Sequence, residues 1–390
     1  MKVNRVLIFF SLVFLVYFLV NAYVLRRGMQ CFPAGDPVRT AVLWIGGILA
    51  VSFILGRVLE NYWLSAVSDV FVWIGSFWLA ALTYLFFAAV VIDLLRLSDA
   101  IVSWFPAAVT VDPVRTTRFV FWGVIGLVSA LVIAGHINAR FPRIHRITVP
   151  IAKKADDPRP VRIALLSDIH LGTIVGRSRL RSIVGHLEEI DPDVILLAGD
   201  IVDEDLGPVI KENTGEILRT IHAPMGVFGI TGNHEYIGGA AQAVAYLQEH
   251  GITMLRDTFV VLPNGITLVG REDRSSRQFG GQRRKDLGVL LEGVRHDRPI
   301  VMMDHQPFDL DSVEAAGVDL QLSGHTHHGQ LWPFNYITNM VYEQSWGYLR
   351  KGNAQFYVSS GVGSWGPPVR LANRPEIVEI TLTFTDPAQR

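Results

Sequence analysis

This sequence contains very little cysteine and carries almost no net charge. The 390 residues include one cysteine, Cys31, and 35 basic side chains are balanced by 36 acidic ones. A single cysteine excludes a disulfide framework within the chain and any metal site built from several thiolates. The balanced charge gives no indication of a nucleic-acid partner, because such partners usually require a basic surface. A chain of this length is expected to form two or three domains.

Charged residues are also rare in roughly the first 140 residues, where four long apolar runs follow one another. Each run reaches the ~20 residues that a helix needs to cross a bilayer. The first run is too long for the core of a signal peptide, and no small-residue cleavage site follows it. We therefore predict a multi-pass helical membrane region over residues 1–140. Its spans are expected at about Val6–Leu25, Thr40–Leu59, Val70–Leu95 and Phe119–Asn138.

Ionisable residues inside these runs would indicate transport rather than anchoring. Glu60, Asp69 and Asp93 lie near the ends of the runs, where we expect them to be solvated. No internal repeat is visible, so we favour a membrane anchor. A membrane sensor or transport protein with a regulatory soluble domain is the alternative from a different class.

Basic residues indicate how the chain is oriented. Lysine and arginine prefer the cytoplasmic flanks of membrane helices. A basic cluster follows the fourth run, within a proline-containing segment, residues 141–160, that we expect to be a linker. We predict that the chain lies in the cell membrane with its C-terminal domain, residues 161–385, in the cytoplasm. The cluster consists of Arg140, Arg143, Arg146, Lys153 and Lys154.

From Val161 onward, short apolar runs alternate with segments of helical periodicity, such as "SRLRSIVGHLEEI" and "AAQAVAYLQEH". Strands that alternate with helices indicate a layered α/β domain. Asn264 and Gly265 in "LPNGITL" predict a hairpin turn. Buried strands are predicted in "VRIALLSD", "PDVILLAGD", "GVFGITGNHE", "PIVMMDHQP" and "VDLQLSGH".

Each of these five strands ends in side chains of the kind that bind metal ions. In α/β sheets, ligand sites form just beyond the carboxyl ends of strands, so we expect these side chains to meet at one rim. Any one of them alone would more often be structural, whereas five successive strand ends together indicate a metal centre. In chain order they are Asp168 and His170, Asp200, Asn233 and His234, His305, and His325 and His327.

The spacing inside "SGHTHHGQ" supports a site for more than one ion. His325 and His327 are two residues apart, and in extended backbone such residues project to the same face. The two histidines are therefore expected to serve neighbouring metals, whereas His328 points elsewhere and is predicted to be structural. Gly232 and Gly324 are expected to allow close approach of the backbone.

The motifs "SDIHLG", "AGDIVDED", "TGNHEY", "DHQP" and "SGHTHHGQ", in this order, resemble the signature of the calcineurin-like metallophosphoesterases. The resemblance covers about Arg162 to Leu382, and the chain is most similar to the membrane-associated, phosphodiesterase-like bacterial subgroup. It implies a metal-dependent phosphoric ester hydrolase. It also implies a four-layer domain, with a sandwich of two β-sheets flanked by helices, in place of a single doubly wound sheet.

The resemblance further implies two divalent metal ions that share Asp200. His234 would then act on the leaving group as a general acid, and Asp203 would orient His234. Nitrogen and oxygen ligands without thiolate suit manganese, iron or zinc. One ion would be held by Asp168, His170, Asp200 and His327, and the other by Asp200, Asn233, His305 and His325.

One departure from the family pattern concerns the substrate. Protein phosphatases of this family have Arg-Gly after the second aspartate, where this chain has Glu204 and Asp205. We expect hydrolysis of a phosphodiester or pyrophosphate bond, in a lipid-linked or envelope substrate, with a broad phosphomonoesterase or nucleotidase as the alternative. The aromatic run "QLWPFNY", with Trp346 and Trp365, is predicted to pack in the fold, and a hydrophobic wall for the substrate is the alternative.

Overall fold

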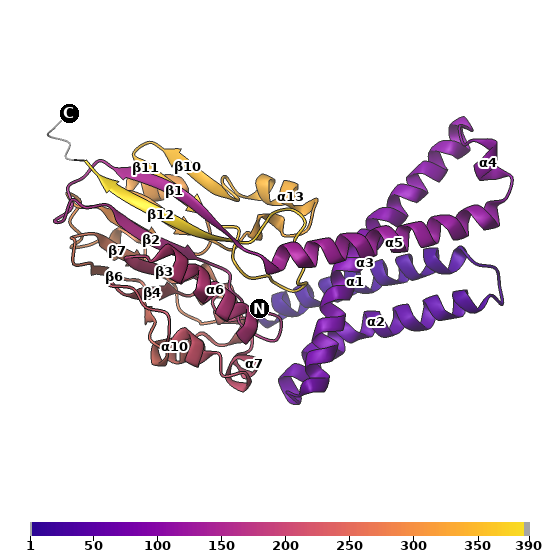
Figure 1. The fold of residues 1–390 in the computed structure, drawn as a ribbon, viewed down its shortest axis with the longest axis horizontal. Coiled ribbons are helices and arrows are strands. Elements are labelled where there is room, and N and C mark those ends of the chain that lie inside the picture. The colour runs from indigo at the N-terminus through magenta and orange to yellow at the C-terminus, as the bar shows by residue number, and fades with distance from the viewer. Residues whose placement is uncertain (1, 386–390) are drawn as a thin grey trace. The chain divides into compact units, whose positions relative to one another are not determined.

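The structure, a computed structural model, describes residues 2–385, with side chains from Ser11 onward. The chain divides into two compact units, one ending at Gly135 and the other beginning at His136 (Figure 1). The division falls inside the last long helix.

Four long helices make up the first unit. Each is long and apolar enough to cross a membrane, so the prediction of four long apolar helices is confirmed, while the crossing itself stays a prediction. Asp36 caps the second helix, because its Oδ1 accepts a hydrogen bond from the Val38 amide at 2.9 Å. The helices are α1 (Lys2–Gln30), α2 (Pro37–Tyr62), α3 (Ala66–Val102) and α5 (Pro113–Arg140), with the short α4 (Ala107–Thr110) before the last.

Helices α2 and α3 approach each other closely at two glycines. A Cβ atom at Gly56 would collide with the backbone of Phe71 and Val72, and one at Gly75 with the backbone of Phe53. Small residues are common where membrane helices pack, because they let the two backbones come together.

Two carboxylates of this unit are paired rather than solvated. Asp93 Oδ2 lies 2.6 Å from Arg27 Nη2 and accepts a hydrogen bond from the Tyr23 hydroxyl at 2.5 Å. Glu60 is buried and accepts a hydrogen bond from Arg57 at 3.0 Å. The expectation of a solvated carboxylate is therefore wrong for Glu60, because a buried carboxylate requires a partner. Asp93 is paired but keeps about a quarter of its side chain exposed.

Two six-stranded sheets form the second unit. The five predicted strands are confirmed as β2 (Val161–Leu166), β3 (Val194–Ala198), β4 (Val227–Ile230), β8 (Ile300–Met303) and β9 (Leu320–Ser323). The predicted hairpin joins β6 (Thr258–Val261) to β7 (Thr267–Gly270) in antiparallel pairing. The order in the first sheet is β1 (Arg143–Ile151), β12 (Glu376–Phe384), β2 (Val161–Leu166), β3 (Val194–Ala198), β4 (Val227–Ile230) and β5 (Thr253–Met254). The order in the second is β10 (Gly347–Lys351), β11 (Ala354–Val358), β9 (Leu320–Ser323), β8 (Ile300–Met303), β7 (Thr267–Gly270) and β6 (Thr258–Val261).

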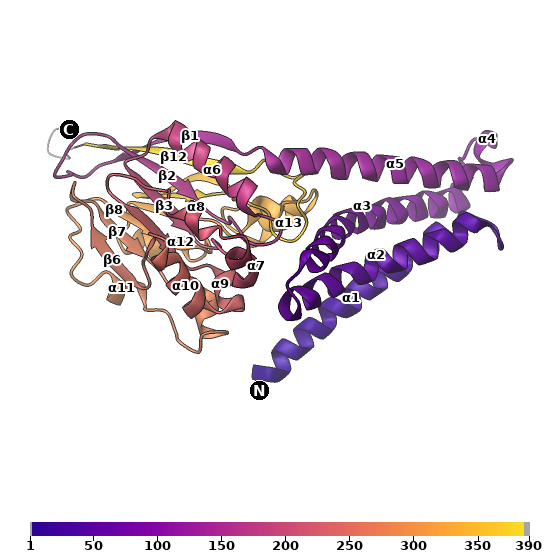
Figure 2. The same ribbon diagram turned by 60° about the horizontal axis from the view of Figure 1, so that its bottom comes forward.

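The sheets face each other across an apolar core, and helices cover their outer faces (Figure 2). Successive residues of a strand point to opposite faces, so Leu165 enters the core between the sheets while Leu166 packs on the outer face. Helices α6 (Arg177–Ile190) and α10 (Ala240–Glu249) cover the first sheet. Helices α11 (Leu287–Leu290) and α12 (Leu310–Ala315) cover the second. The predicted four-layer sandwich is therefore confirmed.

Six shorter helices complete the unit. Two of them, α9 and η2, begin at residues of the predicted metal centre. They are α7 (Leu206–Lys211), α8 (Gly215–Leu218), α9 (Asn233–Gly238), α13 (Phe334–Val341) and the 3₁₀ helices η1 (Arg274–Arg277) and η2 (His327–Gly329).

Part of the segment expected to be a linker is a strand. Residues 143–151 form β1, which pairs in parallel with β12 over its whole length. Val149 and Ile151 are fully buried. The apolar alternation of this segment was masked by its arginines and by Pro150, which is tolerated because β1 is an edge strand.

Removal of β1 should destabilise the second unit. A truncated chain that begins at Phe141 keeps this strand, whereas one that begins at Arg159 leaves β12 as an unpaired edge. We expect the shorter chain to unfold at a temperature several degrees lower, because burial of Val149 and Ile151 contributes about 1.5–3 kcal/mol each. Thermal denaturation followed by circular dichroism measures this. Val149→Asp in the longer chain should reproduce the loss and the exposed Thr148→Asp should not; equal melting temperatures for the two chains would contradict a structural role of β1.

Candidate metal centre

The carboxyl ends of five strands bring the predicted ligands to one edge of the sandwich. Strands β2, β3 and β4 are parallel neighbours in the first sheet, and β8 and β9 are parallel neighbours in the second. The residues that follow them meet across the two sheets. Asp168, after β2, lies beside His327, after β9, and Asp200, after β3, lies beside His305, after β8.

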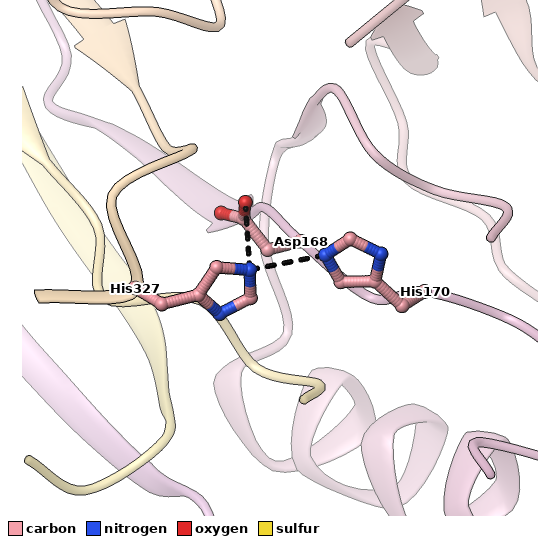
Figure 3. Close-up of side chains that lie close together, drawn as sticks. All are labelled: Asp168, His170 and His327. Carbon is pink, nitrogen blue, oxygen red and sulfur yellow. Dashed lines mark hydrogen bonds and ion pairs between the residues drawn. The ribbon is translucent and has the colours of Figure 1, made fainter. Parts of the chain in front are cut away.

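The first cluster consists of Asp168, His170 and His327 (Figure 3). His170 Nε2 lies 3.0 Å from His327 Nε2, and His327 Nε2 lies 3.5 Å from Asp168 Oδ1. All three side chains are buried. Three electron-pair donors so close together inside a protein require a shared proton or a cation between them.

The second cluster consists of Asp200, His305 and His325. His305 Nδ1 donates a hydrogen bond to the Ala198 carbonyl oxygen at 2.7 Å, because that oxygen can only accept. This bond leaves Nε2 as the ring nitrogen that faces Asp200, whose Oδ2 lies 3.1 Å away. The same Asp200 oxygen is 3.8 Å from His170 Nε2. The Asp200 carboxylate therefore lies between the two clusters.

Asn233 offers a further oxygen ligand. Its Oδ1 atom is buried and has no hydrogen-bond partner among residues 2–385 that the structure describes. A buried acceptor without a partner is costly unless an ion or water occupies its lone pairs. The donor set of the two clusters, imidazole nitrogen and carboxylate or amide oxygen, therefore fits divalent metal ions.

His234 and Asp203 lie next to these clusters. His234 Nδ1 is 3.0 Å from Asp203 Oδ1, and the same oxygen is 3.6 Å from His170 Nδ1. The His234 amide donates a hydrogen bond to Asp200 Oδ1 at 2.9 Å. The aromatic ring of Trp365 lies 5.8 Å from the His234 ring. The geometry brings Asp203 to the position from which it can orient His234, and that role stays a prediction.

The histidines of the site differ in charge. Burial disfavours the imidazolium of His234, but the negative charges of Asp200 and Asp203 outweigh it and raise the pKa of His234 to about 9. Burial and the neighbouring His305 lower the pKa of His325 to about 4. Burial, His170 and Arg370 together hold the pKa of His327 well below its ordinary value. At neutral pH His325 and His327 are in the form that binds metal, while His234 carries a proton that it can donate.

The backbone at the site is not extended, contrary to the spacing argument. Asp168, His170, His325 and His327 all have positive φ, between 45° and 72°. Residues other than glycine rarely adopt this conformation, and it concentrates at functional sites. These left-handed turns keep Asp168 and His170 in one cluster but separate His325 from His327. His325 joins the second cluster, whereas His327 joins the first. His328, predicted to be structural, contacts Ser345 Oγ at 2.8 Å and is not in either cluster.

Sequence reasoning missed Glu235, whose carboxylate holds the backbone of the site in place. Its Oε2 accepts hydrogen bonds from the amides of Asp200 at 3.1 Å and Gly232 at 2.7 Å, and its Oε1 accepts from Val202 at 2.9 Å. It thereby joins the ends of β3 and β4. Its position three residues after Gly232, the N-cap of α9, is that of a capping-box glutamate, which is a signal that the sequence contains.

Arg370 was also missed, and no local pattern indicates it. The side chain is fully buried. It donates hydrogen bonds to the carbonyl oxygens of Ser360 at 2.8 Å and Gly363 at 3.0 Å, and its Nη2 lies 3.1 Å from His327 Nδ1. Arg370 therefore holds the chain between β11 and β12 against a residue of the first cluster.

Comparison with known proteins agrees with this geometry. The family model described as calcineurin-like phosphoesterase matches residues 161–329. An uncharacterized metallophosphoesterase of Bacillus subtilis is 31% identical over 236 residues, which cover 58% of this chain and 80% of that protein. An uncharacterized metallophosphoesterase of Campylobacter jejuni is 25% identical over 382 residues, which cover 96% of this chain and 98% of that protein.

A relative from Danio rerio is described as a transmembrane protein with metallophosphoesterase domain. It is 30% identical over 269 residues, which cover 66% of this chain and 61% of that protein. This chain thus spans about three fifths of that relative's length. Two sheets that bring aspartates and histidines together at their carboxyl edge define a metallophosphoesterase domain. The chain belongs to the calcineurin-like metallophosphoesterases, a family of metal-dependent phosphoester hydrolases, and its apolar helices associate it with a membrane.

Close backbone approach makes one glycine of the site irreplaceable. A Cβ atom at Gly324 would collide with Asp168 Oδ2 and with the Ser167 side chain. We expect Gly324→Ala to displace the Asp168 carboxylate and to lower the metal content of the purified protein, measured by elemental analysis. Gly185→Ala is the matched control, because a Cβ at Gly185 has open space around it. Full metal content in Gly324→Ala would show that Asp168 is not a ligand.

Proposed function

We propose that this protein is a membrane-anchored phosphoesterase that uses two divalent metal ions to hydrolyse a phosphodiester or pyrophosphate bond. The observation that carries the proposal is the position of Asp200 Oδ2, which lies 3.1 Å from His305 Nε2 and 3.8 Å from His170 Nε2. One carboxylate oxygen can thus serve both clusters. Manganese, zinc and iron match this donor set. When bound, such ions polarise the phosphate and lower the pKa of water.

The ligands divide between the two ions as the clusters do. Asp200 contributes to both ions, and Asn233 completes the second set through its buried Oδ1 atom. Asp168, His170 and His327 would hold one ion, and Asn233, His305 and His325 the other.

His234 is proposed to protonate the leaving oxygen. Its raised pKa, about 9, keeps a proton on the ring at neutral pH. Its Nδ1 atom faces Asp203, so the opposite edge of the ring is the one available to a substrate. Asp203 is proposed as the residue that holds the ring in this orientation.

The acidic rim of the site favours a substrate with little negative charge on the reacting phosphate. Glu204 Oε1 lies 3.8 Å from His234 Nδ1. In the protein phosphatases of this family, a phosphate-binding arginine takes the place of Glu204 in the sequence. A carboxylate at this position repels a dianionic phosphomonoester more strongly than a monoanionic diester. This supports a phosphodiester or pyrophosphate as the substrate over a phosphomonoester.

The membrane region supports a lipid-linked or envelope substrate. We infer that all four apolar helices span the cell membrane, and that the second unit is cytoplasmic because Arg140, Arg143 and Arg146 follow the last helix.

Asp200→Asn should abolish activity through loss of metal. The substitution removes a negative charge that two cations share, so we expect reduced metal content and loss of turnover at every pH. Elemental analysis and assays of bis-p-nitrophenyl phosphate measure the two effects. Asp205→Asn is the matched control, because asparagine can also cap α7 at that position. Normal metal content in Asp200→Asn would rule out the bridging role.

His234→Ala should keep the metals and slow the reaction. General acid help contributes about 10²–10⁴-fold to such rates, so kcat should fall by that factor. The defect should shrink for p-nitrophenyl methyl phosphate relative to phenyl methyl phosphate, because nitrophenolate leaves without protonation. His222→Ala, at an exposed histidine, is the control. A defect that is equal for both leaving groups would refute the proton-donor role.

A further inference from the structure

An exposed apolar surface lies beside the candidate metal centre. Its six side chains are between 51% and 86% exposed. Four of them, at 336, 337, 340 and 341, have the spacing of a single helix face on α13. The predicted packing role of the aromatic residues is therefore wrong for the two tryptophans. We call this surface the α13 patch, and it consists of Trp332, Tyr336, Ile337, Met340, Val341 and Trp365.

The patch is tied to the site by Gln330. The Gln330 side chain donates hydrogen bonds to the carbonyl oxygens of Trp365 and Pro367, each at 2.9 Å. The backbone carbonyl oxygen of Gln330 accepts a hydrogen bond from the Leu371 amide at 2.9 Å. Gln330 follows η2, which begins at His327, and it directly precedes the segment that carries Trp332 and α13. The patch and the first cluster are thus parts of one hydrogen-bonded rim.

The same rim is bonded to the last turn of α5. Asn138 Nδ2 donates hydrogen bonds to the carbonyl oxygens of Arg370 at 2.9 Å and Asn373 at 2.8 Å. His136 Nδ1 lies 2.8 Å from the Pro368 carbonyl oxygen. All of these residues belong to the second unit. The chain between Trp365 and Asn373 is therefore fixed to the point where α5 ends.

We place the edge of the bilayer at the end of α5. Helix α5 is apolar from Phe119 to Gly135 and ends at Arg140. Arginines do not lie in the hydrocarbon core without partners, so the membrane border falls within the last turn or two of α5. Because the rim is bonded to this turn, the rim lies at the border as well.

The composition of the α13 patch and its surroundings suits a position at the membrane border. Tryptophan and tyrosine are enriched at membrane interfaces, where one part of the side chain is apolar and the other is solvated. Arg374 donates a hydrogen bond to the Phe141 carbonyl oxygen at 3.1 Å, and Phe141 is itself exposed. The Arg143 guanidinium lies 5.8 Å from the Trp346 ring. These arginines place positive charge where anionic lipid headgroups lie.

We propose that the α13 patch inserts into the interfacial layer of the bilayer that holds α5, so that the metal centre opens toward lipid headgroups. The Trp365 ring lies 5.8 Å from the His234 ring, so a headgroup phosphoester beside the patch is within reach of the site. The substrate class that follows, a phosphodiester or pyrophosphate in the headgroup of a membrane lipid, rests on the proposed function. The insertion rests on the proposed membrane anchoring by α5 and does not depend on the proposed catalysis.

Spin labels test the insertion without any assay of activity. In full-length Cys31→Ser protein, Met340→Cys is labelled with a nitroxide and the protein is placed in vesicles of phosphatidylcholine and phosphatidylglycerol. We expect faster collision with oxygen, which partitions into lipid, than with a water-soluble nickel complex. Val261→Cys, on β6 at the opposite edge of the second sheet, is the control and should show the reverse order.

The result should be the same after removal of metal with a chelator, because insertion needs no catalysis. A Met340 label as accessible to the nickel complex as the Val261 label would overturn the proposal. Protection of Met340 from both reagents would also overturn it, since a protein contact would then cover the patch.

A charge in the patch tests the substrate class. We expect Met340→Asp to lower turnover of a long-chain phospholipid diester in vesicles by at least about tenfold, because a carboxylate resists burial in lipid. Turnover of soluble bis-p-nitrophenyl phosphate should be unchanged, and Val261→Asp should affect neither. Equal losses on both substrates would assign the patch a purely structural role. If the unsubstituted chain cleaves neither substrate, the proposed function fails while the spin-label result stands.

Discussion

A buried negative charge between histidines is the constraint on which the second unit depends. The Asp200 side chain is withdrawn from water, so its charge must be balanced inside the protein. His305 and His170 face Asp200 Oδ2, and the His234 amide donates a hydrogen bond to Asp200 Oδ1. Glu235 accepts a hydrogen bond from the Asp200 amide. These partners follow strands of both sheets. Compensation of this charge therefore depends on how the two sheets pack against each other.

The rest of the fold holds the site in strained conformations. Positive φ at a non-glycine residue costs about 1–3 kcal/mol, and Asp168, His170, Asp200, His325 and His327 all adopt it. Each of these turns follows a strand whose residues are buried on both faces, because helices cover the outer faces and the sheets cover each other. Burial of these strands offsets the strain, so that the candidate ligands converge at one edge of the sandwich.

One segment of chain joins the candidate metal centre to the last turn of α5. Between β11 and β12, the buried Arg370 contacts His327, Trp365 reaches His234, and the backbone accepts hydrogen bonds from Asn138 in the last turn of α5. The same segment therefore fixes the orientation of a candidate ligand, forms part of an exposed apolar surface and anchors the end of an apolar helix.

Local pattern in the sequence determined the apolar helices, the five central strands and the types of ligand at their ends, because each depends on residues close together in the chain. The strand β1 was not predicted, because Pro150 and the arginines interrupt its apolar alternation. Its partner β12 also lies at the other end of the domain in sequence. The separation of His325 from His327 depends on left-handed turns that only the surrounding contacts stabilise. Glu235 and Arg370 acquire their roles from residues far away in sequence, and the exposure of Trp332 and Trp365 depends on what packs around them. Tertiary structure alone decided these features, because contacts between distant residues leave no periodic signal in the sequence.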